Sequence, residues 1–232
     1  MSLQVILPSS GQYINGGTGP LGSSFVAVTD GFGDLPPSVV LVNPHVPYNV
    51  TVLLDNFYGL QFNSMNDLKI HPLSGAIFFS DVSLPNEINI RPTPLMPNQV
   101  YRLDPLTRAV RVVATDFDLC NGIAFSADGK SVFVTDSGAA TSISDVDQTR
   151  PATMYGSPLR YLIQHRGNVY AGCGDGVHVW SPEGTLLGKF FTGDSVANMQ
   201  FAGDGRLVLL GGTKIYMARI AARGAKVSFP RF

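Results

Sequence analysis

Two asparagines stand at the entrances of short apolar runs and have the chemistry to bind a cation. Asn66 precedes Asp67 at the start of one run, and Asn121 precedes Gly122 at the start of another. Carboxamide oxygens, a carboxylate and water are ligands that calcium and similar hard divalent ions accept. An Asn-Gly pair is also common in plain turns. The metal-binding interpretation therefore depends on whether the two asparagines occupy equivalent places in a repeat.

A repeat of that kind runs through the chain: a short apolar strand, a turn that ends in glycine, and a second apolar strand. The turns are centred on Gly75, Gly129, Gly167 and Gly205. The last three follow one another at intervals of 38 residues, and a proline-rich excursion at residues 84–97 explains the wider first interval. A four-stranded propeller blade takes roughly 40–45 residues. The repeat predicts such blades around an axis, with Asn66 and Asn121 near the same end of a central channel.

The composition agrees with many short strands joined by tight turns. Only 14% of the 232 residues are charged, and the chain contains 25 glycines and 16 prolines. The runs rich in β-branched or aromatic residues are each closed by Gly, Pro, Asn or Asp, and helical periodicity is hardly visible. The strands expected before the second asparagine cover residues 25–29, 39–42, 50–54, 67–70, 76–80, 99–103 and 110–114. The sequence predicts an all-β fold.

Charge and cysteine usage exclude several classes of protein. The net charge is −1 and like charges form no run, so neither nucleic acid nor an acidic membrane is expected as a partner. Cys120 and Cys173 lie far apart and form no CxxC, which predicts two buried free thiols. The N-terminal residues do not resemble a signal peptide, and no apolar run approaches the roughly 18 residues of a membrane helix. The expected location is cytoplasmic.

Other motifs predict structure rather than chemistry. Residues 17–22 spell GxGxxG, but a strand-like run follows where a dinucleotide-binding helix should begin, so a loop is expected. His71 and His165 precede the turns of their blades, which predicts a solvent-side or turn-capping role. His178 should share a strand face with Trp180.

Three long stretches resemble the fungal lactonohydrolase branch of the gluconolactonase/regucalcin/luciferin-regenerating-enzyme-like family. They read FNSMNDLKIHPLSGAIFFSD, NQVYRLDPLTRAVRVVATDFDLCNGIAFSADGKSVFVTDSGAA and GNVYAGCGDGVHVWSPEGTLLGKFFTG. The resemblance implies a six-bladed β-propeller that binds a divalent cation, commonly calcium, in its channel and hydrolyses lactones.

The same resemblance assigns site residues. Asn121 matches the metal-binding Asn, with Cys120 in place of the usual preceding Pro, and Asn66 matches an auxiliary Asn that contacts substrate. The family's first-blade Glu has no counterpart, and Ser-Pro-Leu-Arg-Tyr at residues 157–161 replaces the expected Pro-Asp-Gly. That Asp would be ligand and general base, so the catalytic base is unknown. Loss of both carboxylates predicts weakened or lost cation binding.

The implied architecture is one domain over residues 1–232, an incomplete propeller of the six-bladed type. It has about five blades: the first family blade is absent, and a partial blade lies near residues 139–160. Open blade edges predict self-association.

Two functions from different classes follow. The first is metal-assisted hydrolysis of a lactone or small cyclic ester, such as a polyketide-like metabolite, in fungal secondary-metabolite biosynthesis. The alternative is a non-hydrolytic propeller that has lost its metal-site carboxylates and acts as a binding module or as a template for metabolite cyclisation or cycloaddition. A truncated gene product is a third possibility.

Overall fold

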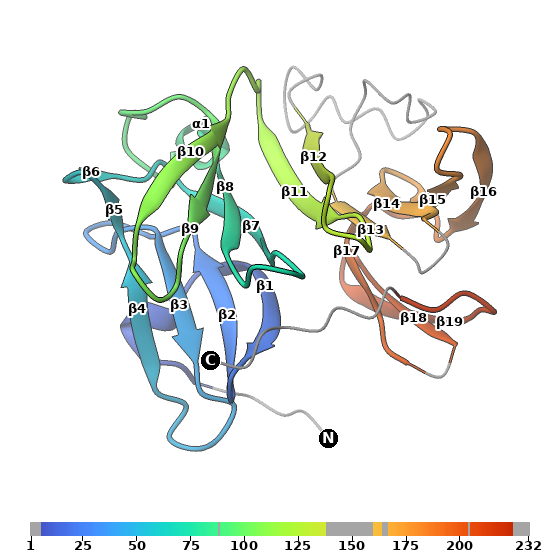
Figure 1. Ribbon diagram of the computed structural model, residues 1–232, viewed down its shortest axis with the longest axis horizontal. Helices are drawn as coiled ribbons and strands as arrows, with labels where there is room; N and C mark the ends of the chain where they lie inside the picture. The colour runs from blue at the N-terminus through green and yellow to red at the C-terminus, as the bar shows by residue number, and fades with distance from the viewer. Residues whose placement is uncertain (1–5, 88, 138–159, 164–166, 204, 225–232) are drawn as a thin grey trace. The chain divides into compact units, whose positions relative to one another are not determined.

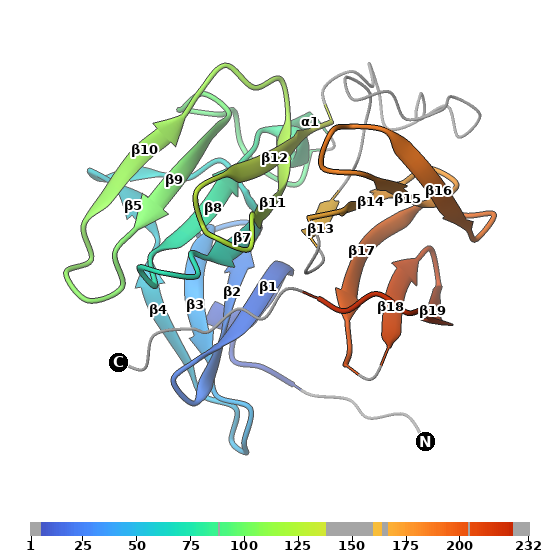
Figure 2. The same cartoon turned by 45° about the vertical axis from the view of Figure 1, so that its right-hand side comes forward.

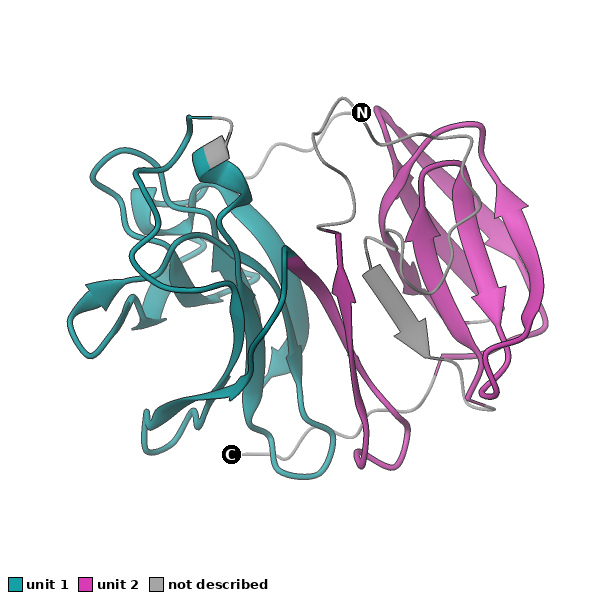
Figure 3. Ribbon diagram, turned by 90° about the horizontal axis from the view of Figure 1, so that it is seen from above, with its two compact units in different colours: residues 1–119, 229–232 teal, residues 120–228 magenta. Residues whose placement is uncertain are grey.

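The computed structural model describes residues 6–87, 89–137, 160–163, 167–203 and 205–224, with the backbone alone for Glu87 and residues 160–163. Over these ranges the chain forms nineteen strands, one helix of four residues, α1 (Leu84–Glu87), and one 3-10 turn, η1 (Ser9–Gly11). The all-β prediction is confirmed. The chain divides into two compact units, residues 1–119 with 229–232 and residues 120–228 (Figure 3).

Unit 1 contains two four-stranded antiparallel sheets in which each strand pairs with its neighbour in the chain (Figure 1). The first sheet consists of β1 (Ile14–Leu21), β2 (Ser24–Thr29), β3 (Ser38–Val42) and β4 (Val50–Leu54). The second consists of β7 (Met65–Ile70), β8 (Ile77–Asp81), β9 (Gln99–Leu103) and β10 (Val110–Ala114). A small hairpin of β5 (Asn56–Phe57) and β6 (Leu60–Gln61) lies between them in sequence.

An aromatic cluster lies at the centre of the unit 1 core. The Phe79 and Tyr101 rings stack with centroids 5.2 Å apart, and Phe62 meets both of them edge-on. All three side chains are almost fully buried among aliphatic residues of β2, β3, β7 and β8. Burying one such side chain contributes about 1.5–3 kcal/mol, so this cluster fixes the strands that carry the candidate site.

Unit 2 contains three antiparallel sheets within the described residues (Figure 2). A hairpin joins β11 (Cys120–Phe125) to β12 (Val132–Asp136). The four-stranded sheet consists of β13 (Arg160–Ile163), β14 (Val169–Cys173), β15 (Gly176–Trp180) and β16 (Leu186–Phe191), and the three-stranded sheet of β17 (Val196–Phe201), β18 (Arg206–Gly211) and β19 (Lys214–Arg219). Apolar side chains of β14, β15, β17 and β18 form its core.

The predicted repeat is present in the structure. Hairpins β7–β8, β11–β12 and β17–β18 turn around Gly75, Gly129 and Gly205, and each pairs the first two strands of its sheet. Strands β13 and β14 pair in the same way, with residues 164–166 of their turn outside the described ranges. The seven strands expected between residues 25 and 114 all form, with ends within two residues of the prediction. Most of the partial blade expected near residues 139–160 falls outside the described residues.

The prediction of a loop at the GxGxxG motif is wrong. Residues 14–21 form strand β1, which pairs with β2 through two register irregularities. Glycine is used here for close packing: a Cβ at position 16 would lie 2.6 Å from the Asn66 carbonyl oxygen. Gly22, with φ +60°, makes the turn into β2. Because glycine has a low β-propensity, the sequence did not predict this strand, which forms through tertiary packing.

Among the described residues, no helix has the length and apolar character needed to cross a membrane.

Candidate functional site

Asn66 and Asn121 occupy the same position in their two hairpins. Each is the second residue of the first strand, and the two residues are 7% and 8% exposed. The residue before each asparagine pairs with the last residue of the next strand, and the register then shifts. These preceding pairs are Met65–Asp81 and Cys120–Asp136. Both asparagines therefore lie on a bulge at the strand entrance, a feature that re-aims side chains.

A hydroxyl group secures each of these bulges in the same way. The Asp67 backbone N–H donates to Ser80 Oγ at 3.1 Å, and the Gly122 N–H donates to Thr135 Oγ1 at 2.6 Å. Ser80 and Thr135 are both buried. The hydroxyls supply the acceptor that the shifted register removes from the strand ladder.

The two predicted site residues belong to different units. Asn66 lies in unit 1 and Asn121 in unit 2, so each is described with its own unit. The Asn121 Nδ2 atom donates to Ser137 Oγ at 3.5 Å. Cys120, which stands where the family resemblance expects Pro, is fully buried beside it.

A third asparagine, Asn15, occupies the equivalent place in β1. Ile14 pairs with Thr29, the end of β2, and the register shifts immediately after Ile14. Asn15 Nδ2 donates to Asp30 Oδ1 at 3.1 Å. The sequence did not single out Asn15, because its Gly-rich segment is typical of a loop. The signal that could have found it is Asn15-Gly16 after an apolar residue, as in Asn121-Gly122.

A buried polar network lies beside Asn66 in unit 1. The Asp81 carboxylate, fully buried, accepts the backbone N–H groups of Asn63 at 3.1 Å and Ser64 at 2.8 Å. Burial raises the pKa of Asp81 to about 7, although these two hydrogen bonds and the Arg91 cation act in the opposite direction.

The same network anchors the proline-rich excursion between β8 and β9. Asn63 Nδ2 donates to the Met96 carbonyl at 2.7 Å. The Arg91 guanidinium donates to the carbonyls of Asn63 and Leu35, both at 3.2 Å. Residues of the excursion thus link the segment before β7 to the turn after β2 through hydrogen bonds.

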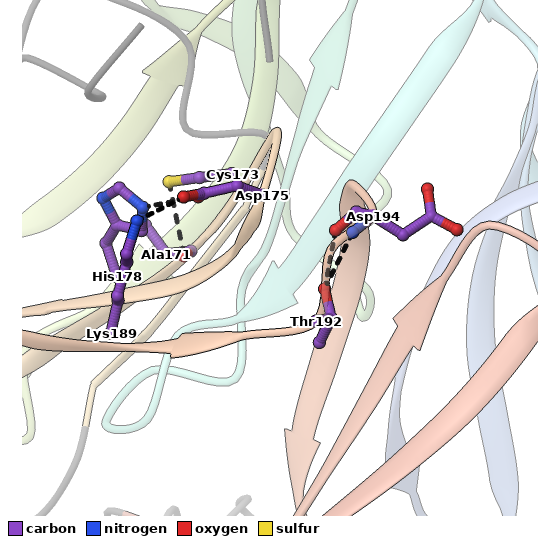
Figure 4. A network of polar contacts seen from close by, with 7 residues as sticks. All are labelled: Ala171, Cys173, Asp175, His178, Lys189, Thr192 and Asp194. Atoms are coloured by element: carbon purple, nitrogen blue, oxygen red, sulfur yellow. Dashed lines mark hydrogen bonds and ion pairs between the residues drawn. The ribbon is translucent and has the colours of Figure 1, made fainter. Parts of the chain in front are cut away.

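A second polar cluster lies in unit 2 where β14 turns into β15 (Figure 4). His178 Nε2 lies 2.7 Å from Asp175 Oδ1, and Lys189 Nζ donates to Asp175 Oδ2 at 2.5 Å. Burial alone would raise the pKa of Asp175, but these two bonds hold it below its ordinary value. The His178 and Trp180 rings are 5.6 Å apart, which confirms their shared face.

Two further predictions about side chains are confirmed. Cys120 and Cys173 are free and buried. Burial raises the pKa of Cys173 to about 12, so its thiol stays protonated and is a poor nucleophile. His71 caps its turn, because its Nδ1 accepts the Ser74 backbone N–H at 3.1 Å. His165 lies outside the described residues.

The donor atoms at Asn66 and Asn121 are fewer and less anionic than calcium requires. The described residues contain no group of three His, Cys, Asp or Glu side chains placed to hold a metal ion. Calcium sites usually combine six to eight oxygens and include carboxylates. Amide oxygens at Asn66 or Asn121 alone do not fit a high-affinity site. Residues 157–159, where the family base was expected, lie outside the described ranges.

Solved structures define the class of fold. The chain superposes on a gluconolactonase from Xanthomonas campestris with a TM-score of 0.69 and 21% identity, over 87% of this chain and 68% of that one. It superposes on regucalcin, a calcium-binding protein from Agrobacterium tumefaciens, with a TM-score of 0.65 and 13% identity, over 94% of each chain. The fold is that of an incomplete β-propeller of this type.

Sequence comparison then gives the family. Residues 20–210 match the model of the SMP-30/gluconolactonase/LRE-like region, and the chain belongs to this family. Lactonohydrolase oryL of Aspergillus oryzae is 30% identical over 205 residues, which cover 73% of this chain and 46% of that protein. A gluconolactonase of Zymomonas mobilis is 26% identical over 196 residues, covering 75% and 54%. The chain therefore spans about half the length of these relatives.

Proposed function

We propose that this chain hydrolyses a lactone or small cyclic ester, with a polyketide-like metabolite of fungal secondary metabolism as its substrate class. Membership of a family with lactonohydrolases and a gluconolactonase among its similar members supports the proposal. The observation that carries it is the equivalent placement of Asn66 and Asn121 on bulges at strand entrances. Such positions hold polar side chains in fixed directions.

The proposal keeps Asn66 as a substrate contact and Asn121 as a ligand for a divalent cation, calcium. Because amides without a carboxylate set bind calcium weakly, we expect a Kd of about 10⁻⁴–10⁻³ M or weaker. No catalytic step is assigned to the ion.

A lactone panel tests the proposal directly. Five- and six-membered lactones, sugar lactones and macrocyclic lactones are incubated with the full chain, with added calcium or with EDTA, and the hydroxy acid is quantified by chromatography. We expect hydrolysis above the spontaneous rate for at least one ring class. No turnover across the panel contradicts a lactonase. Unchanged calcium-dependent turnover in Asn121→Ala contradicts the metal role of Asn121.

One observation favours the non-hydrolytic alternative. Asn121 is buried and its amide is engaged by Ser137, so its side chain has a use inside the protein. A binding module or cyclisation template would retain such residues for stability alone. Tight calcium binding in isothermal titration counts against this alternative.

A further inference from the structure

Asp30 places a carboxylate at the edge of unit 1, within hydrogen-bond distance of Asn15. It follows the end of β2 directly, and its backbone N–H donates to the Tyr13 carbonyl at 2.9 Å. Its side chain is half-buried, so it is fixed by protein on one side and open to solvent on the other. A carboxylate in such a position can be oriented and still reach a small molecule.

Two hydrogen bonds orient this carboxylate through a single oxygen. Oδ1 of Asp30 accepts Asn15 Nδ2 at 3.1 Å and Ser64 Oγ at 2.7 Å. Both bonds end on Oδ1, and no hydrogen bond to Oδ2 is seen in the described part of the chain; the Arg91 cation also interacts electrostatically with Asp30. Ser64 is itself fixed, since it is fully buried and its backbone N–H donates to Asp81 Oδ1 at 2.8 Å. The orientation of Asp30 thus depends on the buried residues Ser64 and Asp81.

Close packing brings Asn66 to the same edge. Strand β1 passes so near to β7 that a Cβ at Gly16 would lie 2.6 Å from the Asn66 carbonyl oxygen and 2.8 Å from Asp67 Oδ1. Gly16 follows Asn15, and Ser64 lies two positions before Asn66. Asn15, Asp30 and Ser64 are therefore joined by hydrogen bonds at this edge, and the Asn66 backbone lies next to Gly16.

This combination suits ester hydrolysis. A carboxylate removes a proton from water, and side-chain amides stabilise the negative charge that develops on a carbonyl oxygen. The reaction requires a proton acceptor and hydrogen-bond donors close together, because water must be activated next to the carbonyl that it attacks.

We propose that Asp30 is the general base of this chain, resting on the proposed lactone hydrolysis. Asp30 Oδ2 accepts a proton from water as the water oxygen bonds to the lactone carbonyl carbon. The tetrahedral intermediate then breaks its bond to the ring oxygen, and that oxygen takes the proton from Asp30. Lactone and water become one hydroxy acid, and the Asp30 carboxylate is regenerated. Asn15 and Ser64 are positioning residues that hold Asp30.

The test uses a lactone that the full chain hydrolyses. In Asp30→Asn we expect kcat to fall by about 10²–10⁴ while KM changes little, as for loss of a general base. The acid limb of the pH–rate profile should disappear in the same variant. Ser64→Ala should lower kcat by a smaller factor and leave that acid limb in place, since the base is still present but less well held.

Asp55→Asn is the matched control. Asp55 is also a half-buried aspartate directly after a strand of unit 1, and its Oδ1 accepts Asn56 Nδ2 at 2.8 Å. In the described structure its hydrogen bond is made with Asn56 and not with Asn15, Asn66 or Asn121. We expect its kinetics to match the wild type.

The outcomes separate the inference from the function on which it rests. An active wild type with Asp30→Asn within about threefold of its kcat overturns the role of Asp30 and leaves lactone hydrolysis intact. A wild type that hydrolyses no lactone of the panel overturns both. If Asp30→Asn fails to fold, Asp30→Glu is used as the test variant. It keeps the charge but moves the carboxylate by one methylene. An unchanged kcat in Asp30→Glu also overturns the inference.

Discussion

Single hydroxyl groups hold the bulges on which the candidate site depends. Thr135 Oγ1 accepts the buried N–H of Gly122 at 2.6 Å. Thr135→Val keeps the shape of the side chain but leaves this N–H without its acceptor, which costs about 1–3 kcal/mol. We expect a lower free energy of unfolding in urea titration. Thr115→Val is the control, since Thr115 is exposed and its hydroxyl donates to the neighbouring Asp116. Equal losses in both variants would contradict the role of the bulge.

The raised pKa of Asp81 leads us to expect a pH dependence of stability. Its pKa is about 7 in the folded chain against an ordinary value of 3.8, because burial disfavours its charge. Between these pH values the folded state keeps a proton that the unfolded state has lost. The contribution of Asp81 to stability should therefore be fully present below about pH 4, fall as pH rises towards 7, and level off above that. A shift of this size corresponds to roughly 4 kcal/mol across the window.

Asp81→Asn tests this dependence. Asparagine cannot ionise, so the slope of stability against pH between 4 and 7 should flatten, whatever the change in absolute stability. Asp116→Asn, at an exposed position, should keep the wild-type slope. Denaturant titrations at several pH values give the measurement, and an identical slope in Asp81→Asn would refute the assignment.

Among the elements, strand β1 differs most from the prediction made from the sequence. Gly16 lets it approach β7, and Gly16→Ala would place a Cβ 2.6 Å from a backbone oxygen. The strands must then separate, so we expect loss of stability of about 1–3 kcal/mol together with reduced lactone turnover. Gly17→Ala is a close control in the same strand, where the nearest atom would be 3.5 Å away. If melting curves show Gly17→Ala to be the worse variant, β1 does not pack as described.

The other strands could be predicted because their apolar runs are local signals. Strands β4, β9 and β10 begin and end at the predicted residues, since β-branched runs closed by turn residues need no tertiary information. The equivalence of Asn66 and Asn121 also followed from the repeat of strand, turn and strand. Asn15 and Asp30 did not, because their roles depend on strand register and on a glycine contact between two sheets. Neither feature is visible without pairing partners.

At the scale of the whole molecule, the number of sheets and the family membership agree on an incomplete propeller. Three sheets have four strands in the described residues, and hairpin β11–β12 and the sheet β17–β19 have fewer. The chain also spans about half the length of its curated relatives. The expectation of one domain over residues 1–232 stays a prediction, since the chain divides into two compact units.

Open strand edges lead to a prediction about association. Among the described residues, β19 is the last strand of its sheet, and it carries Ile215 and Met217, which are 76% and 62% exposed. The edge of a sheet can pair with another chain, and a net charge of −1 provides little repulsion against it. We expect the mass measured by multi-angle light scattering to rise with protein concentration, and Ile215→Lys with Met217→Lys to suppress the rise. Leu73→Lys, at an equally exposed turn, should not. A monodisperse monomer at every concentration would show that these edges are protected in solution.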